Sequence, residues 1–262
     1  IPEEKLDVFP HNANVLDWAK YLQAWLVIGV GGIAGQDLLQ RSMSARNERI
    51  AEYSAYLSGA IYLTIGLIPV FIGIVGANLL PKIENPEYIV PQVALQFLPP
   101  VAAAIFITAL LAAVMSSADS ALLACASIIG NNILSQFKKT KENVLIFSRI
   151  SIPVCAILAL IVALYFKNIY QLLLASYSIS LVALFAPFTA GIWWKKANTS
   201  GAIAAMSSGL ASWILFQFLL PSHPGDLYAM FISIIALVLG SVLTQKTDPP
   251  LALTDLDGKL LT

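Results

Sequence analysis

The segment TALLAAVMSSADSALLACASIIGNN, residues 108–132, decides how the rest of the chain is interpreted. It reads as a membrane span, yet it carries a run of hydroxyls and one carboxylate. Four of its small residues share one face at helical spacing, namely Ala113, Ser116, Ser117 and Ser120. Asp119 lies at the edge of that face. An ionisable residue at membrane depth costs about 2.5–3.5 kcal/mol on insertion scales, so it marks a functional site by default. The alternative is that serine and alanine only pack helices together.

The composition predicts an all-α polytopic membrane protein. Hydrophobic residues make up 58% of the chain and charged residues only 11%, with a mean hydropathy of +0.78. Soluble domains carry about 25% charged residues. The 15 basic and 15 acidic residues balance, and they form no basic face, which argues against a nucleic-acid partner. The expected surroundings are a lipid bilayer.

Seven segments have the length of about 20 apolar residues that a bilayer core requires. Their approximate cores are residues 18–36, 53–78, 101–133, 147–166, 169–194, 200–220 and 226–245. The chain opens with Ile1 rather than methionine, and residues 1–15 are polar and proline-punctuated. We expect them to be the remnant of an external loop, so that the chain begins inside a loop.

The distribution of Lys and Arg predicts the orientation of these spans. If the first span runs inward, eleven basic residues fall on one side and four on the other. This excess places the eleven in the cytoplasm, together with the C-terminal tail, residues 246–262. Residues 79–100 then form an external, proline-rich loop, long enough to hold a short helix.

Four glycines in the stretch GVGGIAG, residues 29–35, lie within the first predicted span. Glycine costs about 1 kcal/mol relative to alanine in a helix interior, so the cluster indicates a helix break or a very close helix contact. Broken helices in lipid line cavities or lie buried in protein. Pro69 and Pro187 predict kinks in later spans.

Three motifs in this order carry a resemblance to a known family. They are GGIAGQDLLQRSMSARNE at 31–48, AAVMSSADSALLACAS at 112–127 and P-x-x-x-G-x-W-W-K-K-x-N-x-x-G-A at 187–202. Together they resemble the sodium:solute symporter family, from about residue 15 to 245. The chain is most similar to the branch that includes the high-affinity choline transporters.

The resemblance implies a LeuT-type fold of two inverted five-helix repeats. Residues 16–194 would be the second repeat and residues 195–245 two peripheral helices, with the N-terminal repeat missing from this chain. It also implies sodium-coupled symport of a small organic solute by alternating access, in the plasma membrane.

Carried over by position, the family's sodium site falls on the backbone carbonyl of Ala113 and the hydroxyls of Ser116 and Ser117. Asp119 and Ser120, with Ser116, match a second sodium site of some members. The chemistry of a carboxylate at membrane depth leaves a proton-linked step as the alternative there. Such oxygens suit Na⁺, because a hard cation prefers hydroxyl and carbonyl ligands.

The expected substrate contacts are Gly31, Gly32, Gly35 and Tyr177. Choline transporters of the family carry a tryptophan at the position of Gly35, where a cation–π contact suits a quaternary ammonium. A choline-like substrate is therefore not implied. Amines, amino acids, sugars and carboxylates all remain open.

Two other classes of protein compete with a transporter. An intramembrane aspartyl hydrolase needs two facing carboxylates, and the candidates are Asp37 and Asp119. Asp37, however, lies beside Arg41 at the inner end of its span, where an ion pair accounts for it. No nucleophile motif or phosphate loop points to an enzyme. A non-transporting structural or receptor-like protein is the second alternative, and it would leave the serine cluster without a shared role.

Overall fold

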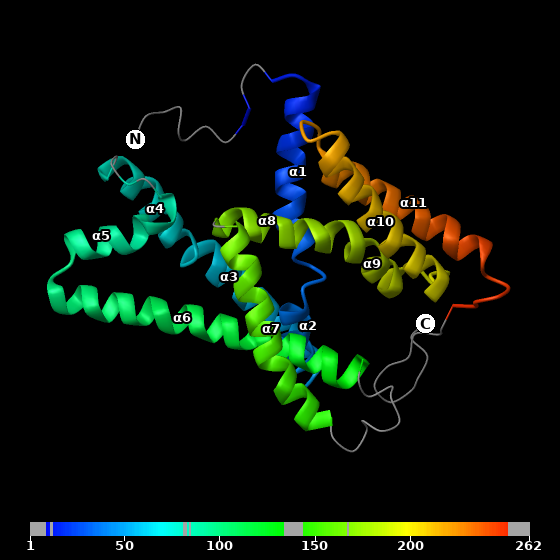
Figure 1. The fold of residues 1–262 in the computed structure, drawn as a ribbon, viewed down its shortest axis with the longest axis horizontal. Coiled ribbons are helices and arrows are strands. Elements are labelled where there is room, and N and C mark those ends of the chain that lie inside the picture. Colours follow the sequence, from blue (N-terminus) through cyan, green and yellow to red (C-terminus); the bar gives the residue numbers. More distant parts are fainter. Residues whose placement is uncertain are drawn as a thin grey trace. The chain divides into compact units, whose positions relative to one another are not determined.

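The computed structural model describes residues 9–10, 13–80, 83, 85–133, 144–166 and 168–250, and these ranges contain helices and no strand (Figure 1). Within them, six helices are long and apolar enough to cross a membrane. This confirms an all-helical polytopic membrane protein. Residues 1–8, 11–12 and 251–262, which belong to the predicted loop remnant and tail, lie outside the described residues.

The six membrane-length helices match six of the seven predicted spans closely. They are Glu48–Leu79, Pro100–Gly130, Leu145–Phe166, Ile169–Trp193, Thr199–Leu219 and Gly225–Leu243. The first predicted span, residues 18–36, differs. Its helix α1 covers Val15–Gly31, 17 residues, and so is about 25 Å long. It stops at the glycine cluster, short of the roughly 30 Å of a bilayer core.

The chain divides into two compact units, which we describe separately. The first unit contains Gln36–Ile169, and the second contains Asp7–Gly35 and Tyr170–Thr262. The helices of the first unit are α2 (Gln36–Met43), α3 (Glu48–Thr64), α4 (Leu67–Leu79), α5 (Ile89–Phe97), α6 (Pro100–Ser127) and α7 (Val144–Phe166). Helix α6 begins at a proline, continues into a π-helical turn at Ile128–Ile133 and packs against α7, α5 and α2.

The kink predicted at Pro69 appears as a break between α3 and α4. The helix is interrupted at Ile65 and Gly66, whose N–H groups both donate to the carbonyl of Ile61, at 2.8 and 3.1 Å. Pro69 has no N–H, and its ring clashes with the carbonyl four residues earlier, that of Ile65. Gly66 permits the tight turn, because a Cβ there would lie 2.5 Å from the carbonyl oxygen of Tyr62.

The predicted external loop holds the expected short helix, α5. Helix α5 packs closely on α4, because a Cβ on Gly76 would lie within 3 Å of the side chains of Ile89 and Val93. The carboxylate of Glu87 accepts a hydrogen bond from the backbone N–H of Ile169. These contacts hold the loop against α4 and against Ile169, the last residue of the first unit.

The helices of the second unit are α1, α8 (Ile169–Ile179), α9 (Ala186–Trp193), α10 (Thr199–Leu219) and α11 (Gly225–Leu243). A π-helical segment, Ser180–Phe185, joins α8 to α9 and contacts α1, α10 and α11. Leu181 and Val182 of this segment are fully buried. The π-helical segment is therefore the centre of this unit's core.

Pro187 accounts for that irregular segment. A proline at this position cannot donate to the carbonyl of Ala183, and π turns commonly absorb such a loss. The kink predicted at Pro187 thus appears as the π-helical segment that ends two residues earlier.

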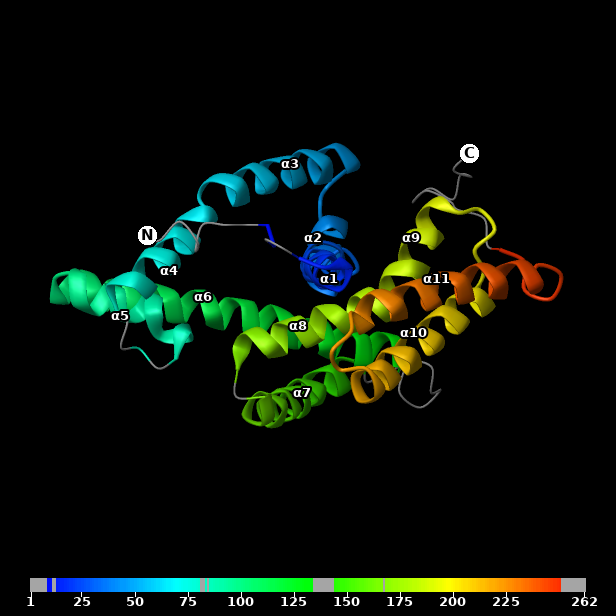
Figure 2. The same cartoon turned by 90° about the horizontal axis from the view of Figure 1, so that it is seen from above.

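Helices α10 and α11 lie side by side in both views of the fold (Figures 1 and 2). Small residues allow this close contact, since a Cβ on Gly201 would lie 2.0 Å from Ser241 Oγ. The hydroxyl of Ser233 donates to the carbonyl of Ala205 at 3.1 Å. Where α10 begins and α11 ends, Asn198 Nδ2 donates to Thr244 Oγ1 at 2.8 Å. Such small-residue contacts and interhelical hydrogen bonds are typical of membrane helix pairs.

Candidate functional site

The predicted sodium-site residues lie in the unbroken α-helical part of α6. The hydroxyl of Ser117 donates to the carbonyl of Ala113 at 3.2 Å, and that of Ser120 donates to the carbonyl of Ser116 at 3.0 Å. Each serine thus lies beside a carbonyl oxygen one turn earlier. A hydroxyl that donates one hydrogen bond keeps lone pairs that can face a cation. Two of the three predicted sodium ligands, the carbonyl oxygen of Ala113 and the hydroxyl oxygen of Ser117, therefore lie next to each other.

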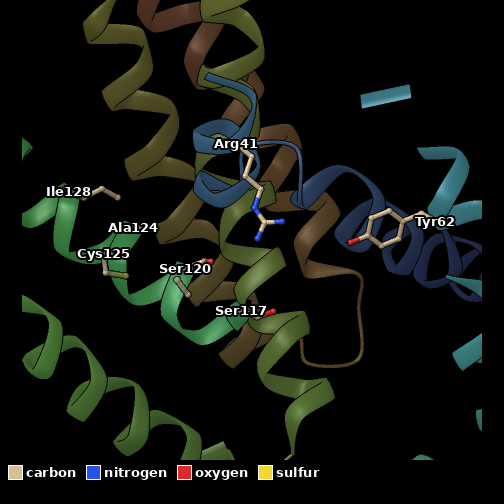
Figure 3. A pocket seen from close by; sticks show the side chains of 8 residues that line it. Arg41, Tyr62, Ser117, Ser120, Ala124, Cys125 and Ile128 are labelled. Atoms are coloured by element: carbon tan, nitrogen blue, oxygen red, sulfur yellow. The ribbon is translucent and has the colours of Figure 1, made fainter. Parts of the chain in front are cut away.

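A cavity of about 400 Å³ opens beside this face of α6. Its lining comes from α2, α3, α6 and the π-helical turn, and includes Arg41, Tyr62, Ser117, Ser120, Cys125 and Ile128. Figure 3 shows the side chains of Arg41 and Tyr62 reaching toward the same space as the two serine hydroxyls. The cavity therefore combines one guanidinium with three hydroxyl groups.

The structure separates the predicted α6 residues into two groups. Ser117 and Ser120 line the cavity, whereas Ser116 and Asp119 do not line it and are exposed on the helix surface. The side chain of Asp37, which was predicted to pair with Arg41, lies outside the described side chains. Arg41 and Tyr62 were not predicted as site residues. The sequence offers a weak signal for Arg41 alone, its place in the Q-D-x-x-Q-R motif.

The predicted break in the glycine cluster is confirmed. Helix α1 ends at Gly31, residues 32–34 form a turn, and α2 begins at Gln36. The N–H of Ile33 donates to the carbonyl of Val30, and that of Gly35 to the carbonyl of Gly32, both at 3.0 Å.

The glycines also make the close contact that was the other interpretation of the cluster. A Cβ on Gly31 would lie 2.5 Å from the carbonyl oxygen of Tyr177, and one on Gly32 would lie 3.8 Å from the Tyr177 ring. Tyr177 packs against the buried cluster that includes Val27 and Leu181. Three of the four predicted substrate contacts thus lie together, and Gly35, also in the second unit, directly follows the turn.

Sequence reasoning missed a buried carboxylate in the second unit. Asp226, only 6% exposed, accepts a hydrogen bond from Trp213 Nε1 and one from the Ser178 hydroxyl. The three residues connect α8, α10 and α11. An acidic residue in the first turn of a helix was the available signal, because the helix dipole favours it there.

Three buried polar atoms of the second unit have no hydrogen-bond partner among the described residues: Gln23 Oε1 in α1, Ser180 Oγ in the π-helical segment and Ser241 Oγ in α11. Buried polar groups are nearly always paired with protein, water or ligand. These atoms therefore indicate where a polar molecule could bind in this unit.

A family model matches the sequence that forms this site. Residues 2–209 match the model of the sodium:solute symporter family. The match includes α6 with its serine cluster and the glycine break.

Individual relatives are transporters of different solutes. The chain is 31% identical to the human high affinity choline transporter 1 over 215 residues, which are 76% of this chain and 36% of the relative. It is 28% identical to the sodium/pantothenate symporter of Haemophilus influenzae over 215 residues, 79% of this chain and 44% of the relative. It is 26% identical to the osmoregulated proline transporter of Bacillus subtilis over 254 residues, which are 92% of this chain and 50% of the relative.

The chain thus spans half or less of the length of these relatives. All three are named as transporters, and none as an enzyme, so the aspartyl hydrolase interpretation finds no support among them. The family model covers well over half of the chain, from the loop before α1 into α10. The chain therefore belongs to the sodium:solute symporter family.

Proposed function

We propose that the protein couples the movement of Na⁺ to the transport of a small organic solute by alternating access. The observation that carries this proposal is the family match across α6, where the carbonyl of Ala113 and the hydroxyl of Ser117 lie 3.2 Å apart. Paired oxygens of this kind suit a dehydrated hard cation. The names of the relatives, which include a sodium/pantothenate symporter, support the same activity.

The proposed sodium site consists of the Ala113 carbonyl and the hydroxyls of Ser116 and Ser117. Rotation about χ1 would turn the Ser116 hydroxyl toward the other two oxygens, since a hydroxyl can adopt any of three staggered positions. In the proposed LeuT-type fold, residues 16–194 form the second repeat and residues 195–245 two peripheral helices. The remaining ligands would come from the N-terminal repeat.

Asp119 and Ser120, with Ser116, form a proposed second ion site, for Na⁺ or for a proton. Asp119 is exposed on α6, one turn from the first site. If a second cation binds there, Asp119→Asn lowers the ratio of sodium ions to solute, which a reversal-potential measurement reports. An unchanged ratio would leave one coupled sodium.

The proposed solute site lies at the glycine break of α1. Its proposed contacts are Gly31, Gly32, Gly35 and Tyr177, of which Gly31 and Gly32 lie against Tyr177. Gln23 Oε1 in α1 is buried without a partner among the described residues. The human choline transporter, the pantothenate symporter and the proline transporter show that relatives handle a cation, an anion and an amino acid. We propose that the solute is small and organic, and that the protein acts in the plasma membrane with its C-terminus in the cytoplasm.

Uptake by the full-length protein in proteoliposomes tests this function. A panel of labelled choline, proline, pantothenate and glucose is offered with an inward sodium gradient, and in parallel with an inward potassium gradient. At least one solute should accumulate only with sodium. Binding of a solute without uptake, in either gradient, would favour a receptor-like protein instead.

A further inference from the structure

We infer that the cavity between α2, α3 and α6 binds the carboxylate of a small organic anion, and that Arg41 is its charged partner. This inference rests on the proposed function, because it names a solute class for the transporter. The cavity lies in the first unit and is a second solute-binding site, separate from the one proposed at the glycine break.

The charge of the cavity favours an anion. Arg41 contributes a guanidinium, and none of the side chains described as lining the cavity is acidic. Asp119, the carboxylate of α6 between Ser117 and Ser120, does not line the cavity. Among the described side chains, to which that of Asp37 does not belong, the guanidinium has no carboxylate beside it in the cavity, and it attracts an anion.

The hydrogen-bond donors of the cavity suit a carboxylate in particular. The guanidinium presents parallel N–H groups that match the two oxygens of a carboxylate. The hydroxyls of Tyr62, Ser117 and Ser120 face the same space (Figure 3) and can rotate to donate to it. The serines donate to helix carbonyls in this structure, bonds that a charged acceptor can replace.

The size and the walls of the cavity favour an organic anion over an inorganic ion. Its volume of about 400 Å³ lies within the roughly 300–1,000 Å³ typical of small-molecule sites. Ala121, Ala124 and Ile128 form an apolar wall beside the polar groups. A carbon chain would lie against this wall while its carboxylate meets Arg41.

Ser117 connects this cavity to the proposed sodium site. Its hydroxyl lines the cavity and also lies beside the Ala113 carbonyl. Sodium on that pair would place a second positive charge near Arg41, and an anion would offset both charges. Sodium and carboxylate should therefore strengthen each other's binding, by the same factor in both directions.

Equilibrium binding to the purified full-length protein in nanodiscs tests the inference. The probes are pairs of similar shape that differ in the carboxylate, butyrate with butyramide and pantothenate with its alcohol, panthenol. We expect at least one carboxylate to bind about tenfold or more tightly than its uncharged counterpart, since a charge-assisted hydrogen bond contributes that much. In Arg41→Gln the two members of that pair should bind within about twofold of each other.

Two further variants control this experiment. Arg46→Gln removes an exposed arginine close in sequence that does not line the cavity, and should keep the carboxylate preference. Arg41→Lys keeps the positive charge but loses the planar guanidinium, so this variant should keep part of the carboxylate preference. Equal binding within every pair, or a preference that survives Arg41→Gln, would overturn the inference.

The outcome is separate from that of the proposed function. Binding is measured without a sodium gradient, so an Arg41-dependent carboxylate preference stands even if uptake proves independent of sodium. Sodium-driven uptake of only uncharged or cationic solutes, unchanged by Arg41→Gln, would overturn this inference and leave symport intact.

Discussion

At the scale of single residues, the hydroxyls of α6 carry the main chemical argument. Ser117 and Ser120 each donate to a carbonyl one turn earlier, which brings pairs of oxygen atoms together along one face. A helix satisfies its own backbone, so side-chain hydroxyls provide the remaining oxygens for an ion at membrane depth. Ser117 lies in both the proposed sodium site and the cavity, and its substitution is therefore the most informative.

Ser117→Ala should raise the sodium concentration for half-maximal uptake about tenfold or more, because the cation loses one hydroxyl ligand, and a polar contact to a charged group contributes about that much. Uptake at saturating sodium should change much less. The measurement is the sodium dependence of uptake in proteoliposomes. Thr108→Val is the matched control, since its hydroxyl also donates to a carbonyl of α6, that of Ala104 at 2.8 Å, away from the cavity. Wild-type sodium dependence in Ser117→Ala would make this serine a packing residue.

At the scale of helices, the irregular segments coincide with glycines and prolines. The break between α3 and α4 lies at Ile65, four residues before Pro69. Pro187 follows the π-helical segment, and the glycine cluster ends α1. Each irregularity frees backbone groups from the helix pattern. At Gly31 the consequence is a close contact between α1 and the backbone of α8.

Gly31→Ala should destabilise the protein by about 1–3 kcal/mol, since a Cβ would lie 2.5 Å from the Tyr177 carbonyl oxygen and overpacking costs about that much. That oxygen belongs to the backbone and cannot move aside as a flexible side chain would. The measurement is the thermal unfolding temperature in detergent. Gly29→Ala is the control, because a Cβ there meets no atom within 4 Å. An equal effect of both substitutions would contradict the contact.

At the scale of the whole molecule, the basic residues set the expected orientation. Eleven Lys and Arg residues fall on the predicted inner side and four on the outer side. The cytoplasmic leaflet and the insertion machinery favour this asymmetry. Each of the six membrane-length helices begins and ends close to a predicted boundary, so the predicted alternation of sides keeps its boundaries at these six helices.

Labelling of single cysteines in intact cells checks the orientation. In a background with Cys125 and Cys155 replaced by serine, Asn85→Cys in the loop before α5 should react with a membrane-impermeant maleimide. Arg46→Cys should react only after the cells are permeabilised. Both positions lie outside the six membrane-length helices. Reaction of Arg46→Cys in intact cells would reverse the topology.

The sequence alone determined the helical membrane class, six spans close to their observed bounds, the glycine cluster as the place of a break or a close helix contact, and the shared face of Ala113 and Ser117. These features depend on hydrophobic length, on residues with special backbone properties and on spacing within one helix, all of which are local. Only the tertiary structure brought Arg41 and Tyr62 to Ser117 and Ser120, and Trp213 to Asp226. It also left Asp119 outside the cavity and ended α1 early. Such contacts join side chains from different helices, and helix packing rather than spacing along the chain decides which of them meet.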